Sequence, residues 1–214
     1  MKSWIAFLSV GILALASTPH PAVAGQMTFT VLENSRATFK SEALLETVVG
    51  TTSGPAVSGT VTGDLARPQA ATGVIRVDLA TLRTGHAMRD ADMLGKDYLD
   101  TKKETNRYAV FELKGVEMAG PLQPGNGVPA KLRGTLTIKG VPVNLAADAH
   151  VSYLKLTPEQ LETQRNFGFT SDTVRVSAKF NTSFTNHRMQ IPQVMFSRLS
   201  NDIQLDVDLT LVRK

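Results

Sequence analysis

Hydrophobic and polar residues alternate one by one over most of the chain, which is the pattern of β-strands with one buried and one solvent-facing side. The alternation is longest near the C-terminus, where Ile203, Leu205 and Val207 are separated by single polar residues. The pattern predicts strands at 26–32, 35–49, 56–64, 70–80, 108–118, 130–139, 141–152, 173–185 and 199–212. Gly54-Pro55 and Gly120-Pro121 supply turn signals between them.

Strands of this kind can stack as a sandwich or close into a barrel, and the alternation alone does not choose between the two. Strands of about ten residues favour a closed antiparallel barrel, because closure removes exposed sheet edges. The sequence therefore predicts a mainly β fold.

Two segments interrupt the strand pattern and predict helices. The first, at about 86–98, is expected to lie on the surface of the β-structure. Its predicted apolar stripe consists of Ala87, Ala91, Leu94 and Tyr98, with Arg89, Asp92 and Lys96 on the opposite, solvent-facing side. The second, at about 158–166, has Thr157 as its N-cap and Gln160 placed to complete a capping box.

The N-terminus predicts an export signal. Lys2 precedes an apolar run at 4–16, and Ala22-Val23-Ala24 provides the small-residue pattern of a cleavage site. We expect residues 1–24 to be removed and residues 25–214 to form a single domain outside the cytoplasm, periplasmic or secreted. The later sequence contains no uncharged apolar stretch of the roughly 20 residues that a transmembrane helix needs.

Composition narrows the chemistry. The chain has no cysteine, so thiolate catalysis, cysteine-based metal sites and disulfides are excluded. Its net charge of +4 comes from scattered basic residues without a Lys/Arg-rich run, a pattern that does not favour nucleic-acid binding. No nucleophile elbow, phosphate-binding loop or dinucleotide fingerprint is present. We therefore expect no enzyme.

A metal-assisted hydrolase using His86, Asp90 and Asp97 is the enzymatic alternative, because i, i+4 spacing places the first two on one helical face. Against it, the segment has no second histidine, and zinc sites usually take three protein ligands. Glu42 and Glu46 could form a carboxylate pair, but strands with one wet face carry such residues routinely.

Three stretches together resemble the YceI-like family of exported polyisoprenoid-binding proteins. These are TGHAMRDADMLGKDYLD at 84–100, YAVFELKGVE at 108–117 and GTLTIKGVPVNL at 134–145; NSRATFKSE and VVGTTSG resemble the opening strands of that family. The resemblance implies an eight-stranded antiparallel lipocalin-like β-barrel with the 86–98 helix across it. It also implies a bound isoprenoid, such as a quinone or polyprenyl lipid, and a homodimer.

On this hypothesis the protein carries or sequesters an isoprenoid or other long-chain lipid, needs no other cofactor or metal, and uses its buried strand faces as the cavity wall. The predicted ligand-binding residues are Phe39, Val61, Ile75, Val77, Met88, Met93, Leu94, Phe111, Leu113, Leu136, Ile138, Val143, Phe180, Leu205, Val207 and Leu209. Each of these is also compatible with an ordinary core position, and a solid barrel that binds proteins through its surface is a further alternative. Arg89 and Asp90 are expected to fix the helix to the barrel rather than to contact a lipid head group.

The sequence departs from the family pattern in two places. The region 185–193 reads TNHRMQIPQ and lacks the Asp-Phe-Gly that family members carry after the penultimate strand. The segment 153–170, which contains the second predicted helix, resembles an insertion. Both changes are expected near an end of the barrel.

Overall fold

The structure, a computed structural model, describes residues 25–194 and 197–214. The strands are β1 (Met27–Val31), β2 (Arg36–Glu42), β3 (Thr47–Ser53), β4 (Val57–Asp64), β5 (Arg67–Asp78), β6 (Tyr108–Met118), β7 (Val128–Ile138), β8 (Val141–Lys155), β9 (Asp172–Ser183), β10 (Gln193–Val194), β11 (Ser197–Arg198) and β12 (Asp202–Arg213). The helices are α1 (Ala87–Leu94), α2 (Glu104–Arg107) and α3 (Pro158–Gln164), with 3-10 turns η1 (Gly54–Ala56), η2 (Leu79–Thr81), η3 (Arg165–Phe167) and η4 (Thr185–His187). The predicted signal segment lies outside the described residues.

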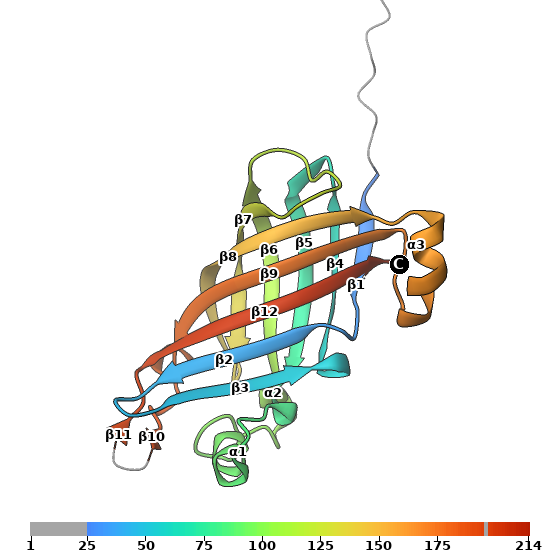
Figure 1. Ribbon diagram of the computed structural model, residues 1–214. Coiled ribbons are helices and arrows are strands. Elements are labelled where there is room, and N and C mark those ends of the chain that lie inside the picture. The colour runs from blue at the N-terminus through green and yellow to red at the C-terminus, as the bar shows by residue number, and fades with distance from the viewer. Residues whose placement is uncertain (1–24, 195–196) are drawn as a thin grey trace, which may run out of the picture.

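Eight strands close into an antiparallel barrel (Figure 1), which confirms the predicted fold. They follow the order β1-β4-β5-β6-β7-β8-β9-β12, and the pairing of β1 with β12 closes the ring. We call the end that carries α1, α2 and η4 the α1 end, and the opposite end, where α3 and the C-terminus lie, the α3 end. Among the described residues, no helix combines the length and hydrophobicity that a membrane crossing needs.

Strands β1 and β2 follow one another along β12, separated by a break at 32–35: β1 pairs with the C-terminal part of β12 and β2 with its N-terminal half. At the break the Thr210 backbone N–H donates to the hydroxyl of Ser35, at 3.0 Å, in place of a backbone carbonyl. Ser35 is fully buried. The side chain therefore maintains the hydrogen bonding that the strand ladder loses at this point.

The single strand predicted at 35–49 is instead the hairpin of β2 and β3, and that prediction is wrong. The chain reverses at 43–46, where the Ala43 N–H donates to the Glu46 carbonyl at 2.7 Å. The turn carries no glycine or proline, and its tip residues Leu44 and Leu45 are 88% and 84% exposed. Alternation and turn composition therefore gave no signal for the reversal.

Helix α1 is shorter than predicted and rotated relative to the prediction. It ends at Leu94, after which the Gly95 N–H donates to the Asp92 carbonyl and the chain changes direction. Ala87 and Ala91 are exposed and Arg89 is partly buried, so the prediction is wrong for these three residues. The other predicted stripe residues, Leu94 and Tyr98, are partly buried as expected. The reason is that polar contacts of the helix, described below, set its rotation.

Helix α3 follows the prediction closely. The Thr157 N–H donates to Gln160 Oε1 at 2.9 Å, and the Gln160 N–H donates to Thr157 Oγ1 at 3.4 Å, which completes the capping box. The helix continues as η3 and stops at Gly168, whose φ of 84° suits glycine. The segment 153–170 thus places α3 and η3 beside the α3 end of the barrel (Figure 1).

Candidate functional site

The barrel encloses a cavity of about 580 Å³. This volume lies within the roughly 300–1,000 Å³ typical of small-molecule sites. Every strand of the ring contributes to its wall, and nearly all of the lining side chains are aliphatic or aromatic. The alternative of a solid barrel is therefore wrong.

The structure brings most of the predicted ligand-binding residues together around this cavity. Fourteen line it: Phe39, Val61, Ile75, Val77, Met88, Met93, Phe111, Leu113, Leu136, Ile138, Phe180, Leu205, Val207 and Leu209. Their contact with a ligand stays a prediction.

Leu94 and Val143 are not part of the wall. Leu94 is partly buried, but it follows Met93 by about 100° around the helix and does not reach the cavity. Val143 lies at the start of β8. Phe184 and Met189, in the segment after β9, line the cavity and pack in one hydrophobic cluster with Leu136, so this segment forms the wall there in place of Val143.

The cavity stays open because small residues occupy central wall positions. Ala147 and Ala178 are buried on β8 and β9 and line the cavity. Larger side chains at these positions would extend into the interior. Alternation identified this inner face but gave no measure of how much space remained.

Two phenylalanine rings that line the cavity, those of Phe39 and Phe111, each lie against a glycine of the neighbouring strand. A Cβ atom added at Gly50 would stand 2.2 Å from the ring of Phe39, and one at Gly134 would stand 2.5 Å from the ring of Phe111. The glycines therefore leave room for the rings at the wall.

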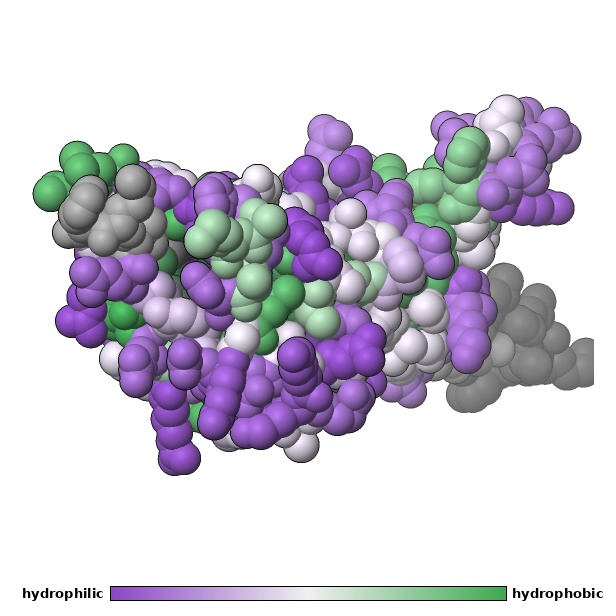
Figure 2. All heavy atoms as spheres, turned by 90° about the horizontal axis from the view of Figure 1, so that it is seen from below, coloured by the Kyte–Doolittle hydropathy of each residue, from purple (hydrophilic) through white to green (hydrophobic). Residues whose placement is uncertain are grey.

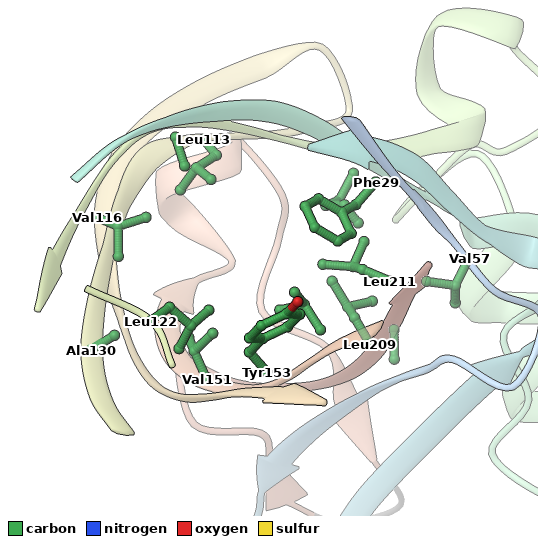
Figure 3. Packing of buried hydrophobic residues seen from close by; sticks show 14 residues of the cluster. Phe29, Val57, Leu113, Val116, Leu122, Ala130, Val151, Tyr153, Leu209 and Leu211 are labelled. Atoms are coloured by element: carbon green, nitrogen blue, oxygen red, sulfur yellow. The ribbon is translucent and has the colours of Figure 1, made fainter. Parts of the chain in front are cut away.

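Loop residues complete the cavity and were missed by the sequence analysis. Leu82 follows η2, Leu122 lies in the β6–β7 loop, and Met189 follows η4; all three are buried and line the cavity. Figure 3 shows Leu122 pointing inward with Val151 at the α3 end. Period-two alternation applies only to strands, so no sequence signal marked these residues.

Polar lining is concentrated at the α1 end, where Glu46, His86, Arg89 and Asp92 line the cavity. Arg89 Nη1 donates to Glu46 Oε1, so the β2–β3 turn and α1 are joined by an ion pair. This confirms the expected anchoring role of Arg89. Figure 2 views the molecule from below, toward this end, and shows hydrophobic surface set among hydrophilic side chains.

Asp90 fixes the start of α1. Its Oδ1 accepts from the Thr84 N–H at 2.7 Å and from the Thr84 hydroxyl at 2.6 Å. Desolvation by burial opposes ionisation of Asp90, but these hydrogen bonds and the charges of Arg83 and Arg89 hold its pKa below the usual value. The carboxylate is thus a local structural group.

The predicted metal and carboxylate sites are not assembled. Asp90 is engaged by Thr84, and within residues 25–194 and 197–214 no three metal-ligating side chains form a group that could hold an ion. Glu42 pairs with Lys40 at 2.7 Å, whereas Glu46 pairs with Arg89. Glu42 and Glu46 therefore belong to separate ion pairs.

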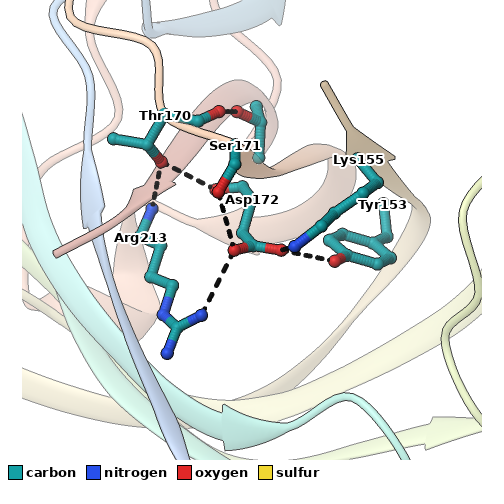
Figure 4. Close-up of polar contacts among 7 residues, drawn as sticks. Tyr153, Lys155, Thr170, Ser171, Asp172 and Arg213 are labelled. Carbon is teal, nitrogen blue, oxygen red and sulfur yellow. Dashed lines mark hydrogen bonds and ion pairs between the residues drawn. The ribbon is translucent and has the colours of Figure 1, made fainter. Parts of the chain in front are cut away.

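The α3 end is held by a cluster around the buried carboxylate of Asp172 (Figure 4). Tyr153 Oη and Lys155 Nζ donate to its Oδ1 at 2.5 and 2.7 Å, and Ser171 Oγ and Arg213 Nη1 donate to its Oδ2 at 3.0 and 3.3 Å. Desolvation opposes ionisation, but these hydrogen bonds, led by that of Lys155, keep the Asp172 pKa well below its usual range. Desolvation and the bond to Asp172 raise the pKa of Tyr153 to about 12.

The two departures from the family pattern lie at opposite ends. Arg188, in the TNHRMQIPQ segment, has a left-handed backbone, with φ of 54°. The residues that follow it contribute Met189, Pro192 and Gln193 to the cavity wall. The segment 153–170 supplies α3 and, through Tyr153 and Lys155, part of the Asp172 cluster instead.

Comparisons with known proteins agree with this geometry. Two UPF0312 proteins, from Shewanella sp. (strain W3-18-1) and Shewanella putrefaciens, are each 36% identical over 93 residues, and the match covers 44% of this chain and 44% of each relative. The chain thus matches less than half the length of these curated relatives.

Solved structures show the same fold. BcnA of Burkholderia cenocepacia is similar with a TM-score of 0.61 and 19% identity, over 82% of this chain and 95% of its own. A polyisoprenoid binding domain from Saccharophagus degradans, implicated in plant cell wall breakdown, has a TM-score of 0.61 and 13% identity, over 89% of this chain and all of its own. The model of the YceI-like domain matches residues 29–211, and the chain therefore belongs to the YceI-like family.

Proposed function

We propose that the protein binds an isoprenoid or other long-chain lipid inside its barrel and carries or sequesters it outside the cytoplasm. The observation that carries this proposal is the apolar cavity of about 580 Å³, walled by every strand of the ring. Family membership and the likeness to a polyisoprenoid binding domain support the choice of ligand class.

Hydrophobic burial is sufficient for binding of this kind. Each buried methylene-sized unit contributes about 0.8 kcal/mol, so a chain of about ten carbons gains roughly 8 kcal/mol before the cost of ordering it. The function needs no chemical step.

The N-terminal sequence supports a place of action outside the cytoplasm. Lys2, the apolar run at 4–16 and the small residues at 22–24 support export through a cleaved signal.

The family resemblance also implies that two chains pair. Light scattering of the purified protein, which measures its molar mass in solution, checks this expectation.

The experiment is organic extraction of protein purified from its natural cells, followed by mass spectrometry of the extract. We expect a long-chain isoprenoid in stoichiometric amount. The same protein, stripped of lipid, should bind an added isoprenoid quinone or polyprenol in titration. An extract without lipid together with failure to bind either compound contradicts the proposal.

A further inference from the structure

Apolar side chains project into solvent at the α1 end of the molecule. Leu44 and Leu45, at the tip of the β2–β3 turn, and Met88 on α1 are three of the five large hydrophobic side chains that are exposed among the described residues. Figure 1 places the turn and α1 at the same end, and Figure 2, which faces that end, shows hydrophobic side chains projecting at its edge. Exposed apolar side chains grouped in this way mark interaction sites.

These side chains lie beside the opening of the cavity. Met88 and His86 line the cavity and are exposed, so the cavity reaches the surface at this end. Leu45 immediately precedes Glu46, and Met88 immediately precedes Arg89. Glu46 and Arg89 also line the cavity, and their ion pair joins the turn to α1. A surface that contacts the leucines therefore lies next to the opening.

Both acidic residues that flank the leucines are neutralised. Glu42 is paired with Lys40, and Glu46 is paired with Arg89. The tip between them, residues 43–45, carries only Ala and Leu side chains. It can therefore leave water without desolvating an unpaired ion.

The stretch beside the tip carries an excess of positive charge. The Ser200 N–H donates to the Glu42 carbonyl, which places the residues after β11 next to the turn. Arg198 on β11 and Arg188 after η4 are exposed and form no ion pair within residues 25–194 and 197–214, where the neighbouring Asp202 is likewise unpaired. Two cations against one anion favour a negatively charged surface, such as a bilayer that contains anionic phospholipid.

The small size of the tip argues against a protein partner. A stable protein interface buries about 800 Å² on each partner and takes about 20–30 residues a side. The tip offers two adjacent leucines. Insertion of apolar side chains into the interface of a lipid bilayer has no such size requirement, and with so few side chains the attachment is weak and reversible.

We propose that the β2–β3 tip inserts into the surface of a phospholipid bilayer and holds the α1 end of the barrel against the membrane. The role of this contact, passage of lipid between membrane and cavity, rests on the proposed function, whereas the docking itself does not. In the α1 segment Asp92 and Asp97 outnumber Lys96, so the hairpin should make the first contact with an anionic surface.

The first test is cosedimentation with vesicles of phosphatidylcholine, with and without phosphatidylglycerol. The variant that combines Leu44→Ser and Leu45→Ser should bind about tenfold more weakly than the native protein, because two exposed leucines no longer enter the bilayer. Arg198→Gln should weaken binding only where phosphatidylglycerol is present. Phe167→Ser is the matched control, because Phe167 is 69% exposed at the α3 end, and it should bind as the native protein does.

The second test reports on the tip directly. The chain has no cysteine, so Leu45→Cys supplies a unique thiol for an environment-sensitive fluorophore. Its emission should shift to the blue when vesicles are added, and the same label at Phe167→Cys should not respond. The double leucine variant should also take up an isoprenoid quinone from donor vesicles several-fold more slowly, with its affinity for a water-soluble short-chain quinone unchanged.

The outcomes separate docking from lipid binding. No vesicle binding by the native protein, or equal binding by the double leucine variant, overturns the docking proposal and leaves lipid binding intact. A dimer that dissociates in the double leucine variant, with no fluorescence shift on vesicles, would assign the tip to a second copy of the chain and also overturn it. Vesicle binding that depends on the leucines, without binding of either quinone, would support docking and contradict the proposed function.

Discussion

The hydroxyl of Tyr153 donates a 2.5 Å hydrogen bond to the carboxylate of Asp172 at the α3 end of the barrel. Tyr153 extends from β8 into the core cluster, and Asp172 begins β9, so the bond joins the ends of two neighbouring strands. Lys155 and Arg213 supply the opposing charges. A carboxylate only 3% exposed is thus stabilised by groups from β8 and β12 and by Ser171.

Replacing Asp172 with asparagine should lower the free energy of unfolding by about 2–3 kcal/mol. The change removes the buried negative charge that pairs with Lys155 and Arg213. Because both cations are about half exposed, they can be hydrated in the variant, so the loss of stability is smaller than that for a fully buried ion pair. Urea unfolding measures it. Asp148→Asn is the matched control, because Asp148 is 82% exposed and its ion pair with Lys131 should contribute less than about 1 kcal/mol. Equal losses in the two variants would refute the assigned role.

The stabilisation by Asp172 should depend on pH. Its pKa in the fold is lowered, so its contribution is fully present above the unfolded pKa of about 4 and is lost as the pH falls below that value toward the folded pKa. The difference in unfolding free energy between the native protein and Asp172→Asn should therefore shrink in acid. A difference that stays constant below about pH 4 would show that the carboxylate is not ionised in the fold.

His187 should make the fold sensitive to mild acid. It is fully buried, with Nε2 2.8 Å from Thr182 Oγ1 and Nδ1 3.1 Å from the Val141 carbonyl. Desolvation by burial lowers its pKa, outweighing the opposite effect of the Val141 bond. Stability is therefore present above the unfolded pKa of about 6.5 and falls at lower pH toward the folded pKa, by at most about 1.4 kcal/mol per pH unit.

The variant His187→Gln should lose this part of the pH dependence, although burial of a poorly fitting amide makes it less stable at neutral pH. Chemical unfolding across the range from about pH 8 to about pH 5 provides the comparison. Exposed His150 offers the control, and His150→Gln should keep the native slope. If His187→Gln also keeps that slope, another group is responsible.

Gly50→Ala should narrow the cavity. The nearest atoms to the added methyl group all belong to the ring of Phe39, a side chain that can move, so the ring is expected to swing toward the interior. Isoprenoid affinity should fall several-fold with little loss of stability. Gly115→Ala is the control, since its methyl group would meet its nearest atom at an ordinary 3.5 Å. Unchanged isoprenoid affinity in Gly50→Ala would contradict the proposed position of Phe39 at the wall.

Ala178→Phe should abolish isoprenoid binding by filling the middle of the barrel. Some loss of stability is expected, because overpacking costs about 1–3 kcal/mol. Lys179→Phe places the same side chain on the neighbouring, exposed position of β9 and should leave affinity unchanged. Calorimetric titration of both variants with one isoprenoid quinone gives the comparison. Equal affinities would place the ligand outside the barrel.

Most strand positions were predictable because half-buried strands repeat every two residues, whereas alternation gave no strand order. Strand β6 was predicted at its observed bounds, 108–118. The β2–β3 reversal was not predictable, since its turn carries Leu44 and Leu45 where glycine, proline or asparagine would have marked it. The rotation of α1 was missed because Arg89 turns inward to reach Glu46, a partner distant in sequence.

The site was predictable on the strands and, through Met88 and Met93, on α1, but not in the loops. Alternation located the inner faces, but the space between them depends on the neighbouring small residues Ala147 and Ala178 of the paired strands β8 and β9, and on how Phe39 lies over Gly50. Those relations arise only when the sheet closes. The polar lining at the α1 end likewise depends on how α1 rests against the β2–β3 turn.

The most direct test of the central claim is a crystal structure of the protein grown with an isoprenoid quinone. We predict continuous elongated density inside the barrel, bounded by Ala178, Val207 and Leu122. An interior filled by the protein's own side chains, with the quinone absent or bound on the outer surface, would contradict the account.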